Sequence, residues 1–213
     1  MKAVTPLQIL ERGAAELGAH LSAAQLGQFE RYLVELQKWN RRINLTGTTD
    51  LQELISRHVL DSLAGLAVLA DVPPGAEVAD LGSGAGFPGL PIKMARPDLR
   101  MTLIEPRQKR AAFLTTVCAL LKLERVTVVE TTISLKQMPT DLGHRFDCVL
   151  MRAVTEPRMA KALAVPLLAS GGRVVIWASR EQADRAGAGF VVHRYHLPET
   201  NIASALLVAR TTT

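Results

Sequence analysis

The stretch VADLGSGAGFPGLPI (residues 78–92) joins a short apolar run that ends in an acid to four glycines and two prolines. It contains the pattern Gly-x-Gly-x-x-Gly, starting at Gly84, which is usually associated with binding of nicotinamide dinucleotides. In that signature the first glycine follows the strand directly, and the helix begins under the pyrophosphate. Here the strand delivers Asp80 first, and the glycines start at Gly82. The loop is therefore out of phase with the dinucleotide signature.

The position of the acid favours a different adenosine cofactor. A carboxylate at the strand tip would repel a pyrophosphate but could hold the ammonium of an amino acid, directly or through water. Acid-x-Gly-x-Gly-x-Gly is the loop of S-adenosylmethionine methyltransferases, in which Gly82, Gly84 and Gly86 let the backbone lie against methionine and ribose without Cβ clashes. Glu105 ends the next apolar run, where both cofactor classes place an acid for the ribose hydroxyls. The alternative without a ligand is a tight glycine turn in which Asp80 caps a neighbouring helix.

Working outward from the loop, apolar runs of about six residues alternate with helical stretches, which predicts an α/β fold with a parallel sheet covered by helices. Pro88 and Pro91 mark the start of the first covering helix. Only LPETN (197–201) separates the final two runs, which predicts an antiparallel hairpin at the sheet edge. The runs are residues 77–81, 101–105, 126–130, 146–151, 173–178, 190–196 and 203–209.

The residues before the loop have helical periodicity instead. We expect three helices, the first over about residues 5–18, the second capped by Ser22 and the third beginning at Thr49. The segment DVPPGAE (71–77) can continue neither helix nor strand. We therefore predict an N-terminal helical extension over residues 1–70 and a methyltransferase domain over residues 71–213.

Composition limits the kind of partner and the compartment. The 213 residues carry 25 Lys and Arg against 20 Asp and Glu, a net charge of +5 spread along the chain, which suits a folded protein that meets a polyanion. The N-terminus lacks a signal peptide, and no apolar stretch reaches the ~18 residues of a membrane span, so we expect a cytoplasmic protein without membrane contact. Cys118 and Cys148, the only cysteines, lie in apolar runs, so neither a disulfide framework nor a metal site is expected.

The sequence after the fourth run indicates which atom is methylated. It reads LMRAVTEP (150–157), without the Asn or Asp, two prolines and aromatic that methylation of an exocyclic base amine needs. Methylation at carbon 5 of a pyrimidine needs a thiolate, and neither cysteine lies at a strand end. A ring nitrogen such as guanine N7 carries no proton and needs only alignment with the methyl group. Protein and small-molecule methyltransferases also lack these motifs and stay open at this point.

Five segments together resemble the bacterial 16S ribosomal RNA guanine-N7 methyltransferase family, also called glucose-inhibited division protein B. The resemblance implies a Rossmann-like, seven-stranded S-adenosylmethionine methyltransferase fold preceded by helices. It also implies methylation of N7 of a guanosine in the 530 loop of 16S rRNA, guanosine 527 in standard rRNA numbering. The partner would be 16S rRNA or a precursor of the small ribosomal subunit, and we expect a monomer. The segments are WNRRINLT (39–46), RHVLDSL (57–63), DLGSGAGFPGLP (80–91), TLIEPRQKRAAFL (102–114) and FDCVLMRAV (146–154).

The resemblance also implies residue roles. Gly82 and Phe87 would contact the cofactor, Glu105 would bind its ribose, and Arg152, the candidate catalytic residue, would face cofactor and target. Ile133 and Ser134 would flank the adenine. Here Thr132-Ile133-Ser134 replaces the usual Arg-x-Glu, and WASRE (177–181) replaces the usual Lys-Gly. How the adenine is held is therefore open.

A second set of residues is predicted to bind RNA, mainly through phosphate charge and RNA shape, because aromatics are only 4% of the chain. Their alternatives are a packing role for His58, a polar network between helices for Asn40 and its neighbours, and a solvated face for the run after Glu105. For the candidate catalytic residue Arg152 the alternative is a surface salt bridge. The two other functions that stay open are a NAD-dependent oxidoreductase and a non-catalytic RNA-binding module with a relic cofactor pocket. The predicted RNA-binding residues are Asn40, Arg41, Arg57, His58, Arg107, Lys109 and Arg110.

Overall fold

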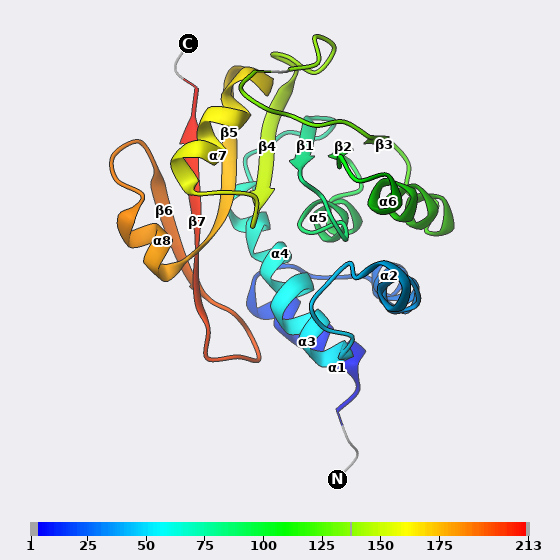
Figure 1. Cartoon of the computed structure of the whole chain (residues 1–213). Coiled ribbons are helices and arrows are strands. Elements are labelled where there is room, and N and C mark those ends of the chain that lie inside the picture. Colours follow the sequence, from blue (N-terminus) through cyan, green and yellow to red (C-terminus); the bar gives the residue numbers. More distant parts are fainter. Residues whose placement is uncertain (1–3, 137, 212–213) are drawn as a thin grey trace.

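The computed structural model describes residues 4–136 and 138–211, and in this part of the chain seven strands form one sheet in the order β3-β2-β1-β4-β5-β7-β6 (Figure 1). The first five strands pair in parallel, and β7 pairs antiparallel with both β5 and β6. The predicted α/β fold and hairpin are confirmed. The strands are β1 (Glu77–Leu81), β2 (Arg100–Ile104), β3 (Val126–Val129), β4 (Phe146–Arg152), β5 (Leu168–Ser179), β6 (Val191–His196) and β7 (Ala203–Arg210).

One strand differs from its prediction. β5 begins at Leu168 rather than at Arg173, because Leu168 pairs with Phe146 of β4 before the register shifts. Gly171 lies in this irregular segment with a φ of +73°. Glycines at a bulge interrupt the apolar pattern, so the pattern does not indicate the first residues of this strand.

Helices at the N-terminus begin where polar caps predict. Thr5 caps α1 (Pro6–Glu16) and Ser22 caps α2 (Ala23–Ile43), each with a glutamine three residues later that completes a capping box. The third helix is composite and starts at Leu51, two residues after Thr49, with Asp50 as its N-cap. It consists of α3 (Leu51–Leu54), a π-helix η1 (Ile55–Leu60), α4 (Asp61–Leu63) and a 3-10 helix η2 (Ala64–Val68).

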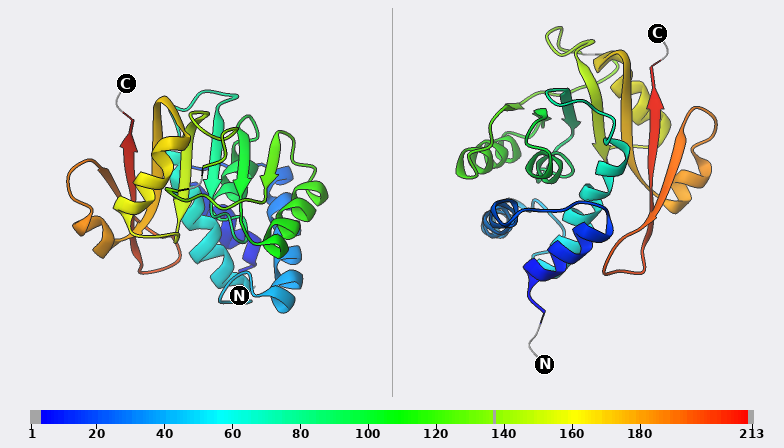
Figure 2. Two further views of the ribbon diagram at one scale, coloured as in Figure 1. Left: turned by 45° about the horizontal axis from the view of Figure 1, so that its top comes forward. Right: turned by 180° about the vertical axis from the view of Figure 1, so that it is seen from behind.

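Helices cover both faces of the sheet, and alternate residues of each strand supply the two cores. Val78 and Leu150 point to the face covered by the N-terminal helices, by α5 (Gly89–Ala95) and by α6 (Gln108–Leu120). Ala79 and Val149 point to the face covered by α7 (Pro157–Ala164), η3 (Val165–Leu167) and α8 (Arg180–Arg185). The views in Figure 2 place the N-terminal helices and α7 on opposite sides of the sheet.

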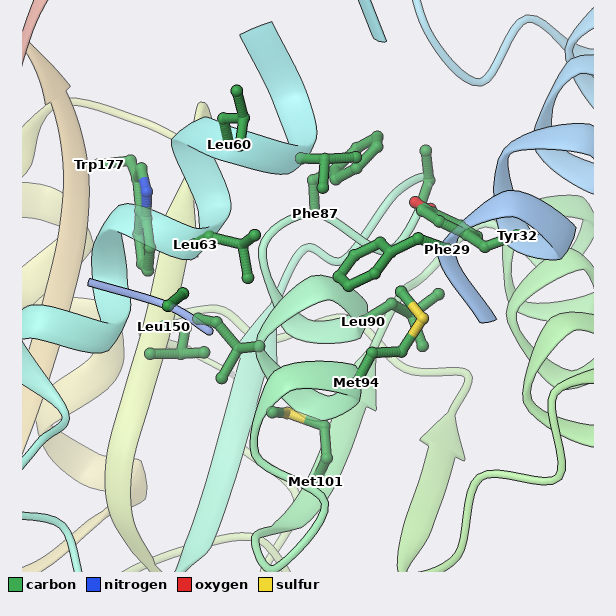
Figure 3. Close-up of a cluster of buried hydrophobic side chains, with 14 of the residues drawn as sticks. Phe29, Tyr32, Leu60, Leu63, Phe87, Leu90, Met94, Met101, Leu150 and Trp177 are labelled. Atoms are coloured by element: carbon green, nitrogen blue, oxygen red, sulfur yellow. The ribbon is translucent and has the colours of Figure 1, made fainter. Parts of the chain in front are cut away.

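The N-terminal helices share one apolar core with the sheet. Figure 3 shows Phe29 and Tyr32 of α2 and Leu63 of α4 packed against Leu90 of α5, with Trp177 of β5 at the side. Each such side chain contributes about 1.5–3 kcal/mol when fully buried. Consequently α2 and the composite third helix lie firmly against the turn that follows β1.

Candidate functional site

The glycine loop connects β1 to α5 at the point where the strand order reverses, between β1 and its neighbours β2 and β4. Open α/β sheets bind ligands at such a switch point, beyond the carboxyl ends of the strands. The backbone angles φ of Gly82, Gly84 and Gly86 are +80°, +55° and +97°, which L side chains rarely adopt. A Cβ at Gly82 would lie 2.9 Å from Val154 Cγ2, whereas one at Gly84 would meet nothing closer than 3.8 Å. The loop thus depends on glycine, and at Gly84 a Cβ would make only ordinary van der Waals contacts, with Arg110 and the Gly82 carbonyl.

Asp80 lies beneath this loop at the end of β1 and is fully buried. Its Oδ2 accepts a hydrogen bond from the Gly89 amide, the first of α5, at 3.0 Å, while Oδ1 has no hydrogen-bond partner among the described residues. Burial raises the pKa of Asp80 to about 7, and the bond from Gly89 opposes part of that rise. Oδ2 therefore binds the start of α5, which is the capping role that the alternative without a ligand predicts. The other oxygen is the kind of unpartnered buried acceptor that an ammonium group would satisfy.

Glu105 follows β2 and is nearly buried beside the loop. Its Oε2 accepts from the Gly84 amide at 2.8 Å, and its Oε1 accepts from the Arg107 amide at 2.9 Å. The predicted ribose acid and the predicted glycine loop are thus in direct contact. Arg107 and Lys109 are exposed at the start of α6, and Arg110 is half-buried there with its Nη1 3.8 Å from a Cβ built on Gly84.

Arg152 ends β4, and its guanidinium binds the composite third helix. Its Nε lies 3.1 Å from Asp61 Oδ2, and its Nη2 donates to the Arg57 carbonyl at 2.7 Å. The same Nη2 lies 3.1 Å from His58 Nδ1. A guanidinium can only donate, so Nδ1 accepts and the His58 ring is neutral. Arg152 therefore joins the sheet to the extension as a largely buried ion pair rather than as a surface salt bridge.

The rings of His58 and Phe87 stack with centroids 5.1 Å apart, and the Arg152 guanidinium carbon lies 5.9 Å from the Phe87 centroid. Burial, followed by the charges of Arg152 and Arg57, lowers the pKa of His58 to about 4. His58 is thus a packed, neutral ring that borders the glycine loop. Phe87 turns its own ring toward the helices, so it anchors the loop from within.

Known protein sequences match this chain over most of its length. Residues 25–190 match the family model described as "rRNA small subunit methyltransferase G". The chain belongs to this family. It is 44% identical to the ribosomal RNA small subunit methyltransferase G of Roseiflexus castenholzii over 77% of this chain and 69% of that protein. It is 35% identical to that of Geobacter sp. strain M21 over 94% and 95% of the two chains.

Solved methyltransferases share the fold at lower identity. A predicted O-methyltransferase from Agrobacterium tumefaciens superimposes with a TM-score of 0.57 at 20% identity, over 70% of this chain and 79% of its own. The TYW2 protein of M. jannaschii, solved in complex with AdoMet, gives 0.51 at 14% identity over 70% and 75%. Family membership confirms the expected methyltransferase with S-adenosylmethionine as its cofactor, and it decides against the NAD-dependent oxidoreductase. The glycine loop and the unpartnered oxygen of Asp80 fit that cofactor.

Asn40, one of the residues predicted to bind RNA, takes part in a local hydrogen-bond network. It is buried, its Nδ2 donates to Thr46 Oγ1 and to the Thr48 carbonyl, and its Oδ1 accepts from the Thr46 amide. Asn40 therefore organises the turn after α2, and its contact with RNA stays a prediction. Arg41 and Arg57 are exposed, and Arg57 lies 3.4 Å from Glu53.

Sequence reasoning missed Tyr32. Its hydroxyl donates to the Ala85 carbonyl of the glycine loop at 2.7 Å, and its ring meets Phe87 edge-on with centroids 5.7 Å apart. The side chain is fully buried, which raises the pKa of its hydroxyl well above the ordinary value. The available signal was its place on the buried face of α2, three residues after Phe29, because a buried tyrosine hydroxyl needs a partner.

The residues predicted to flank the adenine lie after β3. Ile133 and Ser134 are both half-buried, and Ile133 packs against the core on the α7 face.

Within the described residues, no helix is both long enough and apolar enough to cross a membrane.

Proposed function

We propose that this protein transfers a methyl group from S-adenosylmethionine to N7 of a guanosine in 16S rRNA, in the 530 loop at guanosine 527 of standard rRNA numbering. The observation that carries the proposal is the buried Asp80 with one unpartnered oxygen, lying beneath a glycine loop at the switch point of a methyltransferase sheet. The name of its relatives, small subunit rRNA methyltransferases, supports the substrate.

Cofactor binding is assigned to the groups around the loop. When bound there, S-adenosylmethionine supplies a methyl group on a positively charged sulfur. Asp80 Oδ1 would accept a hydrogen bond from the ammonium, and Glu105 would exchange the Gly84 amide for ribose hydroxyls. Gly84 leaves room for close approach, and Ile133 and Ser134 would flank the adenine, with contacts from their backbone.

Chemistry at N7 needs no base, because this nitrogen carries a lone pair and no proton. The protein therefore has only to align the target, which supplies several kcal/mol. Burial raises the pKa of Cys118 to about 11 and that of Cys148 to about 12, so neither supplies the thiolate that methylation at carbon 5 requires. His58 is neutral near pH 7 and already accepts from Arg152, which suits a site without proton transfer.

RNA binding is assigned to cations on two sides of the loop, of which Arg110 is half-buried and the others are exposed. Arg41 and Arg57 project from the helices of residues 1–70, and Arg107, Lys109 and Arg110 project from the start of α6. We assign residues 1–70 as a helical extension that positions rRNA for the methyltransferase domain of residues 71–213, acting as a monomer. Loss of these cations should weaken binding with a shallower salt dependence.

The decisive experiment maps the methyl group. The enzyme is incubated with labelled S-adenosylmethionine and 16S rRNA from cells lacking the activity, and the modified base is located by N7-specific cleavage. Label at N7 of guanosine 527 supports the proposal, whereas label on another atom refutes it. RNA binding without any label, unaffected by Asp80→Ala, would instead favour a non-catalytic RNA-binding module.

A further inference from the structure

A cavity of about 270 Å³ lies beyond the carboxyl ends of β4 and β5, on the far side of Arg152 from the glycine loop. It is closed on one side by the composite third helix and on another by the β6–β7 hairpin. Because Arg152 lines the cavity and also lies over Phe87 of the loop, the cavity adjoins the proposed cofactor site. Its lining residues that matter here are Asp61, Arg152, Trp177, Gln182, Tyr195 and Ser204.

Asp61 is the acidic group of this cavity, and three elements hold it. Tyr195 of β6 donates its hydroxyl to Asp61 Oδ1 at 2.5 Å, and Arg152 of β4 lies 3.1 Å from Oδ2. The indole N–H of Trp177 donates to the Asp61 backbone carbonyl at 2.7 Å. A carboxylate offers about four lone-pair sites, and these contacts use one on each oxygen. Asp61 thus keeps acceptor capacity on both oxygens in a fixed orientation.

Arg152 keeps donor capacity beside it. A guanidinium has five N–H groups, of which Nε faces Asp61 and both on Nη2 face Arg57 and His58. Nη1 has a single contact, the His58 carbonyl at a long 3.5 Å. The cavity wall therefore presents the two acceptor oxygens of Asp61 next to the donor Nη1 of Arg152.

This pattern is complementary to one nucleobase edge. Guanine presents two adjacent donors, N1–H and the 2-amino group, followed by the O6 acceptor, whereas adenine has no N1–H. Enzymes that modify a base extrude it from its stack and read its Watson–Crick edge by hydrogen bonds. N7 lies on the Hoogsteen edge, next to O6, so a contact confined to N1–H, the 2-amino group and O6 leaves its lone pair free.

We propose that the cavity binds the target guanine by its Watson–Crick edge, with Asp61 accepting from N1–H and the 2-amino group and Arg152 donating to O6. The inference rests on the proposed function for its target base. Tyr195 and Trp177 act as positioning residues, because they fix Asp61 from the sheet. The neighbouring groove shares Tyr195 and Ser204 with the cavity, and its own acid, Asp184, is exposed and paired with Arg194 at 2.8 Å.

The test measures nucleotide binding rather than methylation. In a Trp39→Phe background Trp177 is the only tryptophan, and its fluorescence reports titrations with guanosine monophosphate and inosine monophosphate in the presence of S-adenosylmethionine. Inosine lacks only the 2-amino group. We expect guanosine monophosphate to bind at least about tenfold more tightly, as is usual for a bidentate base contact.

Three variants separate the outcomes. Asp61→Asn should abolish the preference for guanosine over inosine, and Asp184→Asn, a matched change in the neighbouring groove, should retain it. If Asp61→Asn does not fold, Tyr195→Phe replaces it: without the hydroxyl that orients Asp61, the preference should fall while both nucleotides still bind. Equal binding of the two nucleotides by the unmodified enzyme, no saturable binding, or a preference that survives Asp61→Asn (or Tyr195→Phe, where it is used) would overturn the inference. A guanosine preference without methyl transfer to rRNA would instead refute the proposed function alone.

Discussion

Asp80→Asn should separate the stability of this protein from its cofactor affinity. Asp80 is fully buried, with one oxygen bound by the Gly89 amide and the other without a partner among the residues that the structure describes. Asparagine is isosteric, and its carbonyl can still accept from Gly89. The substitution therefore removes the buried charge and leaves the loop in place. We expect the variant to be more stable than the unmodified protein above pH 7 and to lose the response to S-adenosylmethionine.

The magnitude follows from the pKa. Burial raises the pKa of Asp80 from 3.8 to about 7, and each unit corresponds to about 1.4 kcal/mol. The folded state of an acid with a raised pKa binds its proton more tightly than the unfolded state. The stabilising contribution of the Asp80 carboxyl is therefore complete below pH 3.8. It is lost as the pH rises through about 7, and the loss amounts to about 4 kcal/mol. The new amide N–H group lacks a partner, which costs about 1–3 kcal/mol, so the net gain at pH 8 is about 1–3 kcal/mol.

Urea unfolding at pH 5 and pH 8 measures this effect, with Asp184→Asn as an exposed control. Other titrating groups are common to both proteins, so the difference between the unmodified protein and Asp80→Asn isolates this carboxyl. That difference should change by about 2–3 kcal/mol between the two pH values, and only the unmodified protein should gain stability from added S-adenosylmethionine. A difference that stays constant with pH would show that Asp80 has an ordinary pKa and would refute the reasoning.

Further predictions concern the groups around the loop. Tyr32→Phe should lower the free energy of unfolding by about 1–3 kcal/mol, because it leaves the Ala85 carbonyl unpartnered. It should also raise the Kd for S-adenosylmethionine, and an unchanged Kd in calorimetry would contradict a role in holding the loop. Gly84→Ala should cost about 1–2 kcal/mol of backbone strain and weaken cofactor binding, whereas Gly75→Ala, at a φ of +81° with nothing within 4 Å, should cost the same and leave binding unchanged. Arg152→Ala leaves Asp61 buried without its cation and should cost about 3 kcal/mol in thermal unfolding. It should also reduce kcat more than RNA affinity in filter binding, and equal losses would contradict its position beside the reaction.

Much of the architecture could be predicted because its signals are local. Apolar runs place all seven strands within a few residues, and Pro88 marks the start of α5 as its N-cap. The positions of Asp80 and Glu105 could also be predicted, because the carboxyl ends of adjacent parallel strands lie at the same edge of the sheet. In the structure Glu105 contacts Gly84 of the loop that follows Asp80. The five-residue extension of β5 was not predictable, because glycines at a register shift interrupt the apolar pattern.

Contacts between distant segments could not be predicted. Tyr195 and Asp61 are 134 residues apart and meet only because β6 lies at one edge of the sheet while the composite helix crosses the strand ends. Asn40 shows the opposite case. Its partners Thr46 and Thr48 are close in sequence, and the polar turn NLTGT (44–48) was a signal for a local network.

The position of β7 determines how one edge of the parallel strands is covered. β6 precedes β7 in the chain but pairs with β7 alone among the described strands, and β7 separates it from β5. Before β7 pairs with it, the edge of β5 presents unsatisfied backbone groups between apolar residues such as Val175 and Ile176, and such an edge is a template for pairing with another chain. Pairing of β7, with β6 as its outer neighbour, therefore covers this edge. Substitutions that loosen this pairing should appear first as aggregation during synthesis or refolding, before any fall in the activity of the molecules that do fold.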